Sequence, residues 1–131
     1  MTLRTQLERE FGRRTLRNPR YSLRAFARFL SLHHTTLVRL MNGSRSPSRA
    51  MLESLGKRLQ LTPNEIRVAQ QHEDVNRILA AARSPAFRAD SRWLAMKTGI
   101  DLDDVNRALH QVIHDGRLVM ASRQAWTVAT P

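Results

Sequence analysis

The first half of the chain takes its fold from one stretch, Phe26 to Gly43, which reads FARFLSLHHTTLVRLMNG. Apolar residues recur at helical spacing at both ends of this stretch, and the short break Ser31-Leu32-His33 separates them. Ser22 is suited to cap the start of the first helix, because its hydroxyl can accept a backbone hydrogen bond. Asn42-Gly43 is suited to end the second helix, since both residues tolerate a positive φ. The stretch therefore predicts two short helices joined by a tight turn.

Three side chains meet the packing demands of a helix-turn-helix. Ala27 is small, as it must be where the second helix crosses close over the turn. Leu32 is apolar and can fill the turn, while Leu37 can hold the second helix against the rest of the domain. We therefore interpret residues 22–43 as a helix-turn-helix. A helical hairpin without a ligand is the alternative interpretation.

The same segment resembles the phage-repressor (Cro/repressor) class of helix-turn-helix, on which residues 26–43 can be laid without a gap. The resemblance extends over residues 20–70 and implies a domain of four or five helices. This class usually has Gly where the chain has Ser31, because the first helix ends through a left-handed residue. The resemblance also implies that the helix beginning near His34 enters the major groove of double-stranded DNA.

The resemblance further implies which side chains contact DNA. Those expected to face base edges lie at the start of the second helix and one turn beyond: His33, His34, Thr35, Thr36 and Arg39. For Arg39 a phosphate contact is the open alternative. Those expected to contact phosphates flank the motif: Ser22, Arg24, Asn42, Arg45 and Ser48.

Positive charge is concentrated in the first half. The 131 residues include 22 Lys+Arg and 11 Asp+Glu, a formal net charge of +11. Residues 1–60 hold 13 Lys+Arg against three Asp+Glu, whereas residues 61–131 hold nine against eight. Codon bias can account for the preference for Arg over Lys, but it does not collect charge in one half. The first half is therefore expected to bind a polyanion.

A first helix is predicted from the apolar stripe Leu3, Leu7 and Phe11, with Gly12, Asn18 and Pro19 as the residues that end it. A flexible basic connector is then expected, carrying Arg13, Arg14, Arg17 and Arg20. A solvated charge run and phosphate or minor-groove contact are both compatible with these arginines. Phe29 stands where repressors usually have a charged residue. We expect it to pack on the first helix or the second half, or to mark a dimer contact.

Further helix signals follow Asn42-Gly43 along the chain. Ser48 is suited to cap a fourth helix, and the capping box Thr62-Pro63-Asn64-Glu65 opens a long helix or two abutting ones. Shorter helices are predicted from Asp90 to Gly99 and from Asp101 to Asp115, followed by a hairpin over residues 118–128. In the Asp101–Asp115 helix the inward residues are expected to be Leu102, Val105, Leu109, Val112 and Ile113.

This order of elements resembles a winged helix over residues 73–129. Its presumptive recognition helix opens with Asp101, Asp103 and Asp104, which suit a helix N-terminus but oppose a phosphate surface. We therefore expect a helix-turn-helix DNA-binding domain over residues 1–71 and a winged-helix-like interaction or dimerisation domain over residues 72–131. The fold class expected is mainly α with one β-hairpin. The pairing of modules resembles a class of small bacterial regulators.

Other classes of function find little support. The longest uncharged run, Phe29 to Val38, has ten residues and is too short to span a membrane. There is no Cys, no Gly-rich phosphate loop and no nucleophile constellation. His110 and His114 have metal-binding spacing but lack an obvious third ligand. We expect no metal, no cofactor and no enzymatic activity.

The expected function is that of a cytoplasmic, sequence-specific regulator whose partner is double-stranded DNA. A homodimer or a protein partner bound through residues 72–131 is also expected. The alternative is a protein-interaction adaptor or antitoxin-like module, in which Asp101, Asp103 and Asp104 bind a basic partner.

Overall fold

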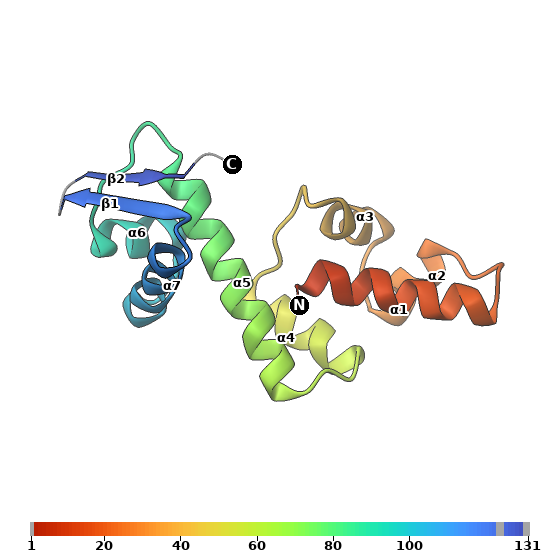
Figure 1. Cartoon of the computed structure of the whole chain (residues 1–131). Coiled ribbons are helices and arrows are strands. Elements are labelled where there is room, and N and C mark those ends of the chain that lie inside the picture. The colour runs from red at the N-terminus through yellow and green to blue at the C-terminus, as the bar shows by residue number, and fades with distance from the viewer. Residues whose placement is uncertain (1, 123–124, 130–131) are drawn as a thin grey trace. The chain divides into compact units, whose positions relative to one another are not determined.

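A computed structural model describes residues 2–122 and 125–129 of the chain (Figure 1). The elements in chain order are α1 (Leu3–Arg17), α2 (Leu23–Phe29), α3 (His34–Asn42), α4 (Arg49–Arg58), α5 (Pro63–Ala82), α6 (Ser91–Thr98), α7 (Leu102–His114), β1 (Leu118–Ser122) and β2 (Ala125–Val128). They form two compact units, Met1–Gln70 and Gln71–Pro131, each with its own hydrophobic core. The predicted mainly helical class with one antiparallel hairpin is confirmed.

The core of the first unit draws on α1 to α5. Its buried side chains are Leu3, Leu7, Phe26, Ala27, Leu30, Leu37, Leu40, Leu52, Leu55 and Ala69. The three apolar positions predicted for the first helix all face this core, with Phe11 partly buried. Amphipathic spacing within each helix therefore orients the elements around one interior.

The first helix is longer than predicted. It continues through Gly12 to Arg17, and the backbone N–H of Asn18 donates to the carbonyl of Arg14 at 3.0 Å. Asn18 caps the end of α1, as predicted, but the expected end at Gly12 is wrong, as is the assignment of Arg13, Arg14 and Arg17 to a flexible connector. One glycine inside a helix costs only about 1 kcal/mol. Tertiary contacts made beyond Gly12 offset that cost.

Arg14 makes those contacts. Its guanidinium carbon lies 3.8 Å from the centroid of the Phe29 ring, and Nε donates to Glu10 at 3.1 Å. Nη1 also donates to the hydroxyl of Tyr21 at 3.3 Å. Phe29 itself packs against the core of the first unit and stacks on Phe26 at 6.4 Å between centroids. Phe29 thus joins α2 to α1, which was one of the three expectations for it.

The helix-turn-helix forms as its sequence predicts. Ser22 caps α2, its hydroxyl accepting from the backbone N–H of Ala25 at 3.1 Å. Ser31 adopts the left-handed conformation with φ 58°, and Gly43 ends α3 with φ 82°. Leu37 is fully buried. Local capping and one buried anchor therefore fix the two helices relative to each other.

The capping signals beyond α3 are also confirmed. Ser48 accepts from the N–H of Met51 at 3.1 Å and opens α4. Thr62 and Glu65 exchange hydrogen bonds of 3.0 and 3.1 Å, which makes the predicted capping box, and one continuous helix follows. Hydrogen bonding to Thr62 lowers the pKa of Glu65 below its ordinary value.

The second unit packs α6, α7 and the hairpin onto the later part of α5. Its core includes Ile78, Leu94, Val105, Val112 and Leu118, and β1 pairs with β2 in the register Leu118↔Val128. The expectation that Leu102 faces inward is wrong, because the Leu102 side chain is 36% exposed. No helix among the described residues is both long and apolar enough to cross a membrane.

Candidate nucleic-acid interface

The first turn of α3 presents polar side chains to solvent. His33, His34 and Thr35 are exposed and Thr36 is half-buried. His33 is the N-cap residue, with φ −66° and ψ 145°, and its side chain makes no capping hydrogen bond. The hydrogen-bonding groups of this turn are therefore available to an external partner.

Arg39 extends the same polar surface by one turn. It follows Thr35 by four residues, so both side chains lie on one face of α3. Leu37 and Leu40 are buried on the opposite side of the helix. The helix thus has one face fixed in the core and another directed outward.

The flanking polar residues are held by local hydrogen bonds. The hydroxyls of Ser22 and Ser48 accept capping bonds from the backbone, which leaves each hydroxyl proton free to donate. The side-chain oxygen of Asn42 accepts from the N–H of Ser44 at 2.9 Å, which leaves its amide NH₂ as a donor. These three residues can each donate to an anion without losing their structural bond.

The charge around α3 is positive and uncompensated. No Asp or Glu occurs between Glu10 and Glu53 in the sequence. Arg24, Arg39 and Arg45 are exposed, and within residues 2–122 and 125–129 their guanidinium groups have no ion-pair partner. By contrast, Arg4, Arg13 and Arg14 of α1 pair with Glu8 or Glu10. Arg24, Arg39 and Arg45 therefore give the helix-turn-helix and the loop after it a positive charge that these ion pairs do not neutralise.

The comparison with family models identifies the same helix-turn-helix. A model described as a helix-turn-helix domain matches residues 3–69. The chain belongs to this helix-turn-helix family. The matched region runs from the start of α1 into α5 and contains every residue expected to contact DNA. Searches of the curated proteins and of the solved structures found no match.

Arg4 lies near the helix-turn-helix, although no pattern in the sequence points to it. The guanidinium of Arg4, in the first turn of α1, lies beside Gly43 at the end of α3. Sequence spacing gives no sign of this contact, because it depends on how α1 packs across α3. Only the tertiary structure brings this charge to the interface.

The acidic start of α7 lies in the second unit, outside the region matched by the family. Asp101 and Asp103 are exposed, and Asp101 caps α7 without a side-chain hydrogen bond. Asp104 is only 23% exposed at its side chain and pairs with Arg107 at 3.1 Å. The structure therefore leaves two of the three carboxylates fully open to a partner.

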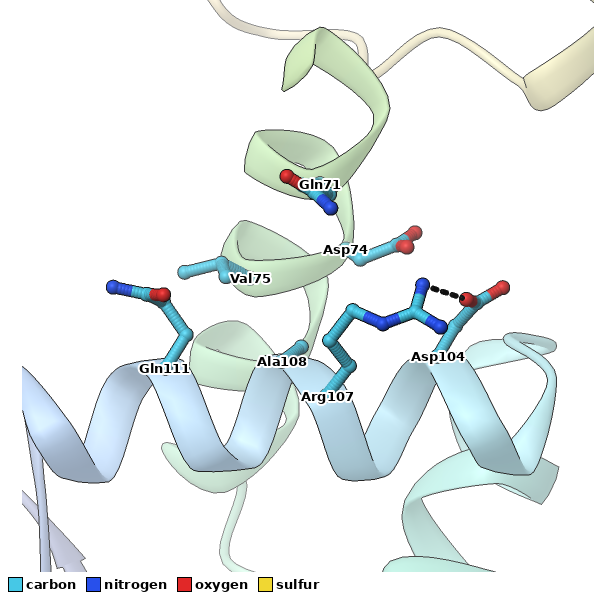
Figure 2. A pocket seen from close by; sticks show the side chains of 7 residues that line it. All are labelled: Gln71, Asp74, Val75, Asp104, Arg107, Ala108 and Gln111. Carbon is cyan, nitrogen blue, oxygen red and sulfur yellow. Dashed lines mark hydrogen bonds and ion pairs between the residues drawn. The ribbon is translucent and has the colours of Figure 1, made fainter. Parts of the chain in front are cut away.

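A hollow of about 180 Å³ lies between α5 and α7 (Figure 2). Its lining combines small apolar, amide and charged side chains: Gln71, Asp74, Val75, Asp104, Arg107, Ala108 and Gln111. Figure 2 shows the Arg107 guanidinium turned toward Asp104, so an ion pair of the chain itself occupies the charged end. Among the described residues no three His, Cys, Asp or Glu side chains are grouped as metal ligands would be.

Proposed function

We propose that the chain is a sequence-specific, double-stranded DNA-binding transcriptional regulator of the phage-repressor type, which reads the major groove with α3. The observation that carries this proposal is the exposed polar first turn of α3, bordered by unpaired arginines and distant in sequence from any carboxylate. An α-helix fits the major groove, where each base pair presents a distinct set of donors and acceptors.

The proposed base contacts follow from the chemistry of the exposed groups. The imidazoles of His33 and His34 can hydrogen-bond to N7, O6 or O4 of the bases, as can the hydroxyls of Thr35 and Thr36. The threonine methyl groups can also contact a thymine methyl. Arg39 carries a forked donor that matches the O6 and N7 of guanine, with a phosphate as the alternative partner.

The proposed phosphate contacts lie on both sides of α3. They come from the starts of α2 and α4, the last residue of α3 and the loop after it: Ser22, Arg24, Asn42, Arg45 and Ser48. Such contacts fix the register of a protein on the duplex but do not read its sequence. They account for affinity, whereas the residues of α3 account for specificity.

The two kinds of contact can be separated by substitution. We expect Arg39→Ala to cost about 1–3 kcal/mol on a selected duplex and to relax base preference at one position. Arg45→Ala should weaken binding to all duplexes alike and reduce the dependence of log K on log salt by about 1.

The measurement begins with selection of bound sequences from a random duplex pool. Fluorescence-anisotropy titrations of the selected and an unrelated duplex then follow at several salt concentrations. Unchanged affinity of Arg39→Ala for the selected duplex would contradict the role of α3. Failure of the pool to converge on any motif would contradict sequence-specific binding itself.

For residues 72–131 we propose a winged-helix-like interaction or dimerisation domain. A dimer would place two α3 helices on half-sites about ten base pairs apart, which compensates for the weak binding of a single domain. We place such a regulator in the cytoplasm, where it would associate with the nucleoid when it binds DNA.

A second candidate function is an adaptor or antitoxin-like module, in which the second unit binds a basic protein partner. The observation favouring it is that Leu102 is 36% exposed between Asp101 and Asp103. Exposed apolar surface beside carboxylates matches a segment that is both basic and apolar. A partner retained by the chain but lost by a variant with both aspartates changed to Lys would support this function, provided that DNA binding shows no sequence preference.

A further inference from the structure

Arg4 places a guanidinium at the end of α3, although it belongs to the first turn of α1. A Cβ built on Gly43 would lie 3.3 Å from Nη1 of Arg4. Gly43 ends α3 in the left-handed conformation, with φ 82°. The Arg4 side chain remains 54% exposed, and its ion pair with Glu8 at 3.2 Å is exposed as well. The charge is thus held beside α3 and is still open to solvent.

The loop next to Arg4 has a defined conformation. The backbone N–H of Arg45 donates to the carbonyl of Arg39 at 3.2 Å, and the N–H of Ser44 donates to Asn42 at 2.9 Å. The first bond fixes the backbone of Arg45, and the second holds the side chain of Asn42. Asn42 and Arg45 are within two residues of Gly43 in the chain, and Arg4 places its guanidinium beside that same glycine.

We infer that Arg4 is a further phosphate-binding residue, which joins Asn42 and Arg45 on one stretch of DNA backbone at the end of α3. This inference rests on the proposed DNA-binding function and adds a contact from α1, outside the helix-turn-helix itself. The ion pair with Glu8 is no obstacle, because exposed pairs contribute little to stability and phosphate is a strong bidentate acceptor for arginine. On binding, phosphate replaces the Glu8 carboxylate as the partner of Arg4.

Arg13 provides a matched control on the same helix. It follows Arg4 by two and a half turns, so it projects from the opposite side of α1. It also makes an exposed ion pair, with Glu10 at 3.4 Å. Arg4→Gln and Arg13→Gln therefore remove the same charge and the same kind of surface bond, but only one of them touches the loop after α3.

The test compares the affinity of the full chain and both variants for a selected and an unrelated duplex, from about 50 to about 200 mM salt. For Arg4→Gln we expect an equal relative loss on both duplexes. Since one phosphate contact contributes about 0.9 to the slope of log K against log salt, this loss should shrink about 3.5-fold across that range. Arg13→Gln should keep the slope of the unmodified chain. Thermal midpoints of the two variants should be alike.

Failure of this inference can be distinguished from failure of the proposed function. An unchanged slope in Arg4→Gln, while the unmodified chain still binds DNA, would overturn the assignment of Arg4 alone. Equal changes in both variants would also overturn it, because net charge rather than position would then account for the loss. Absence of duplex binding by the unmodified chain would overturn the proposed function together with this inference.

Discussion

Ser31 concentrates backbone strain at one residue of the turn between α2 and α3. Its φ of 58° lies in the left-handed region, which costs an L residue about 1 kcal/mol and glycine almost nothing. Hydrogen bonds hold the conformation, since Ser31 N–H donates to Arg28 at 3.1 Å and Leu32 N–H to Ala27 at 2.8 Å. The turn therefore keeps its geometry at a cost in folding free energy that glycine at position 31 would avoid.

We expect Ser31→Gly to raise the free energy of unfolding by about 0.5–1 kcal/mol. The gain is the relieved strain minus the extra flexibility that glycine gives to the unfolded chain. Urea denaturation followed by circular dichroism measures it. Ser46→Gly is the matched control, because Ser46 is exposed and has an ordinary φ, so this change should bring no gain. Equal effects of the two substitutions would contradict the strain at Ser31.

At the scale of elements, α4 and α5 meet through a glycine. A Cβ built on Gly56 would lie 2.6 Å from Cγ1 and 2.8 Å from Cδ1 of Ile66. Ile is branched at Cβ and has few alternative rotamers, so it cannot withdraw easily. Gly56 therefore permits the close approach of the two helices that complete the first unit.

Two Gly→Ala substitutions separate helix propensity from this contact. Gly12 lies inside α1 with nothing within 4 Å of a Cβ, so Gly12→Ala should stabilise the chain by about 0.5–1 kcal/mol. Gly56→Ala should destabilise it by about 1–2 kcal/mol, because the cost of overpacking exceeds the gain in propensity. Thermal and urea unfolding measure both changes. Stabilisation by both substitutions would show that α4 and α5 are not in close contact.

The helices and their caps could be predicted because their signals are local. The hydroxyls of Ser22 and Ser48 and the capping box at Thr62 act within three residues of themselves, so sequence alone reveals them. The continuation of α1 through Gly12 could not be predicted. It depends on the contact of Arg14 with Phe29, which lies on another helix and outweighs a local helix-breaking preference.

The candidate interface likewise has features that the sequence predicts and features that depend on tertiary structure. The exposed start of α3 follows from apolar spacing, which places Leu37 and Leu40 inside and the polar residues outside. The position of Arg4 beside Gly43 and the pairing of Asp104 with Arg107 depend on side-chain geometry. Sequence therefore indicated which surface is exposed, but it did not indicate which charges on that surface are already neutralised.

At the scale of the whole molecule, the two units differ in charge and in chemistry. The region matched by the helix-turn-helix family, residues 3–69, lies within the first unit, where the excess of arginine also lies. The second unit has nearly balanced charge, and two exposed carboxylates, Asp101 and Asp103, lie at the start of α7. Phosphate affinity is therefore expected to reside in the first unit, with the second unit contributing contacts to protein.

This division predicts the response to removing acidic charge from the second unit. Asp101→Asn with Asp103→Asn removes two exposed carboxylates from the start of α7. Charges farther from DNA than the Debye length, about 8 Å at physiological salt, are largely screened. We therefore expect this double variant to bind the selected duplex within about twofold of the unmodified chain, with the same salt slope.

The same anisotropy titrations measure this effect, with Arg45→Ala as the variant that must change the slope. Two carboxylates lying against phosphates would repel them, so their removal would strengthen binding and steepen its dependence on salt. That result would place α7 at the DNA backbone and make the second unit a DNA-contacting module. Unchanged binding would leave Asp101 and Asp103 accessible on the protein–DNA complex, as a protein partner of the second unit requires.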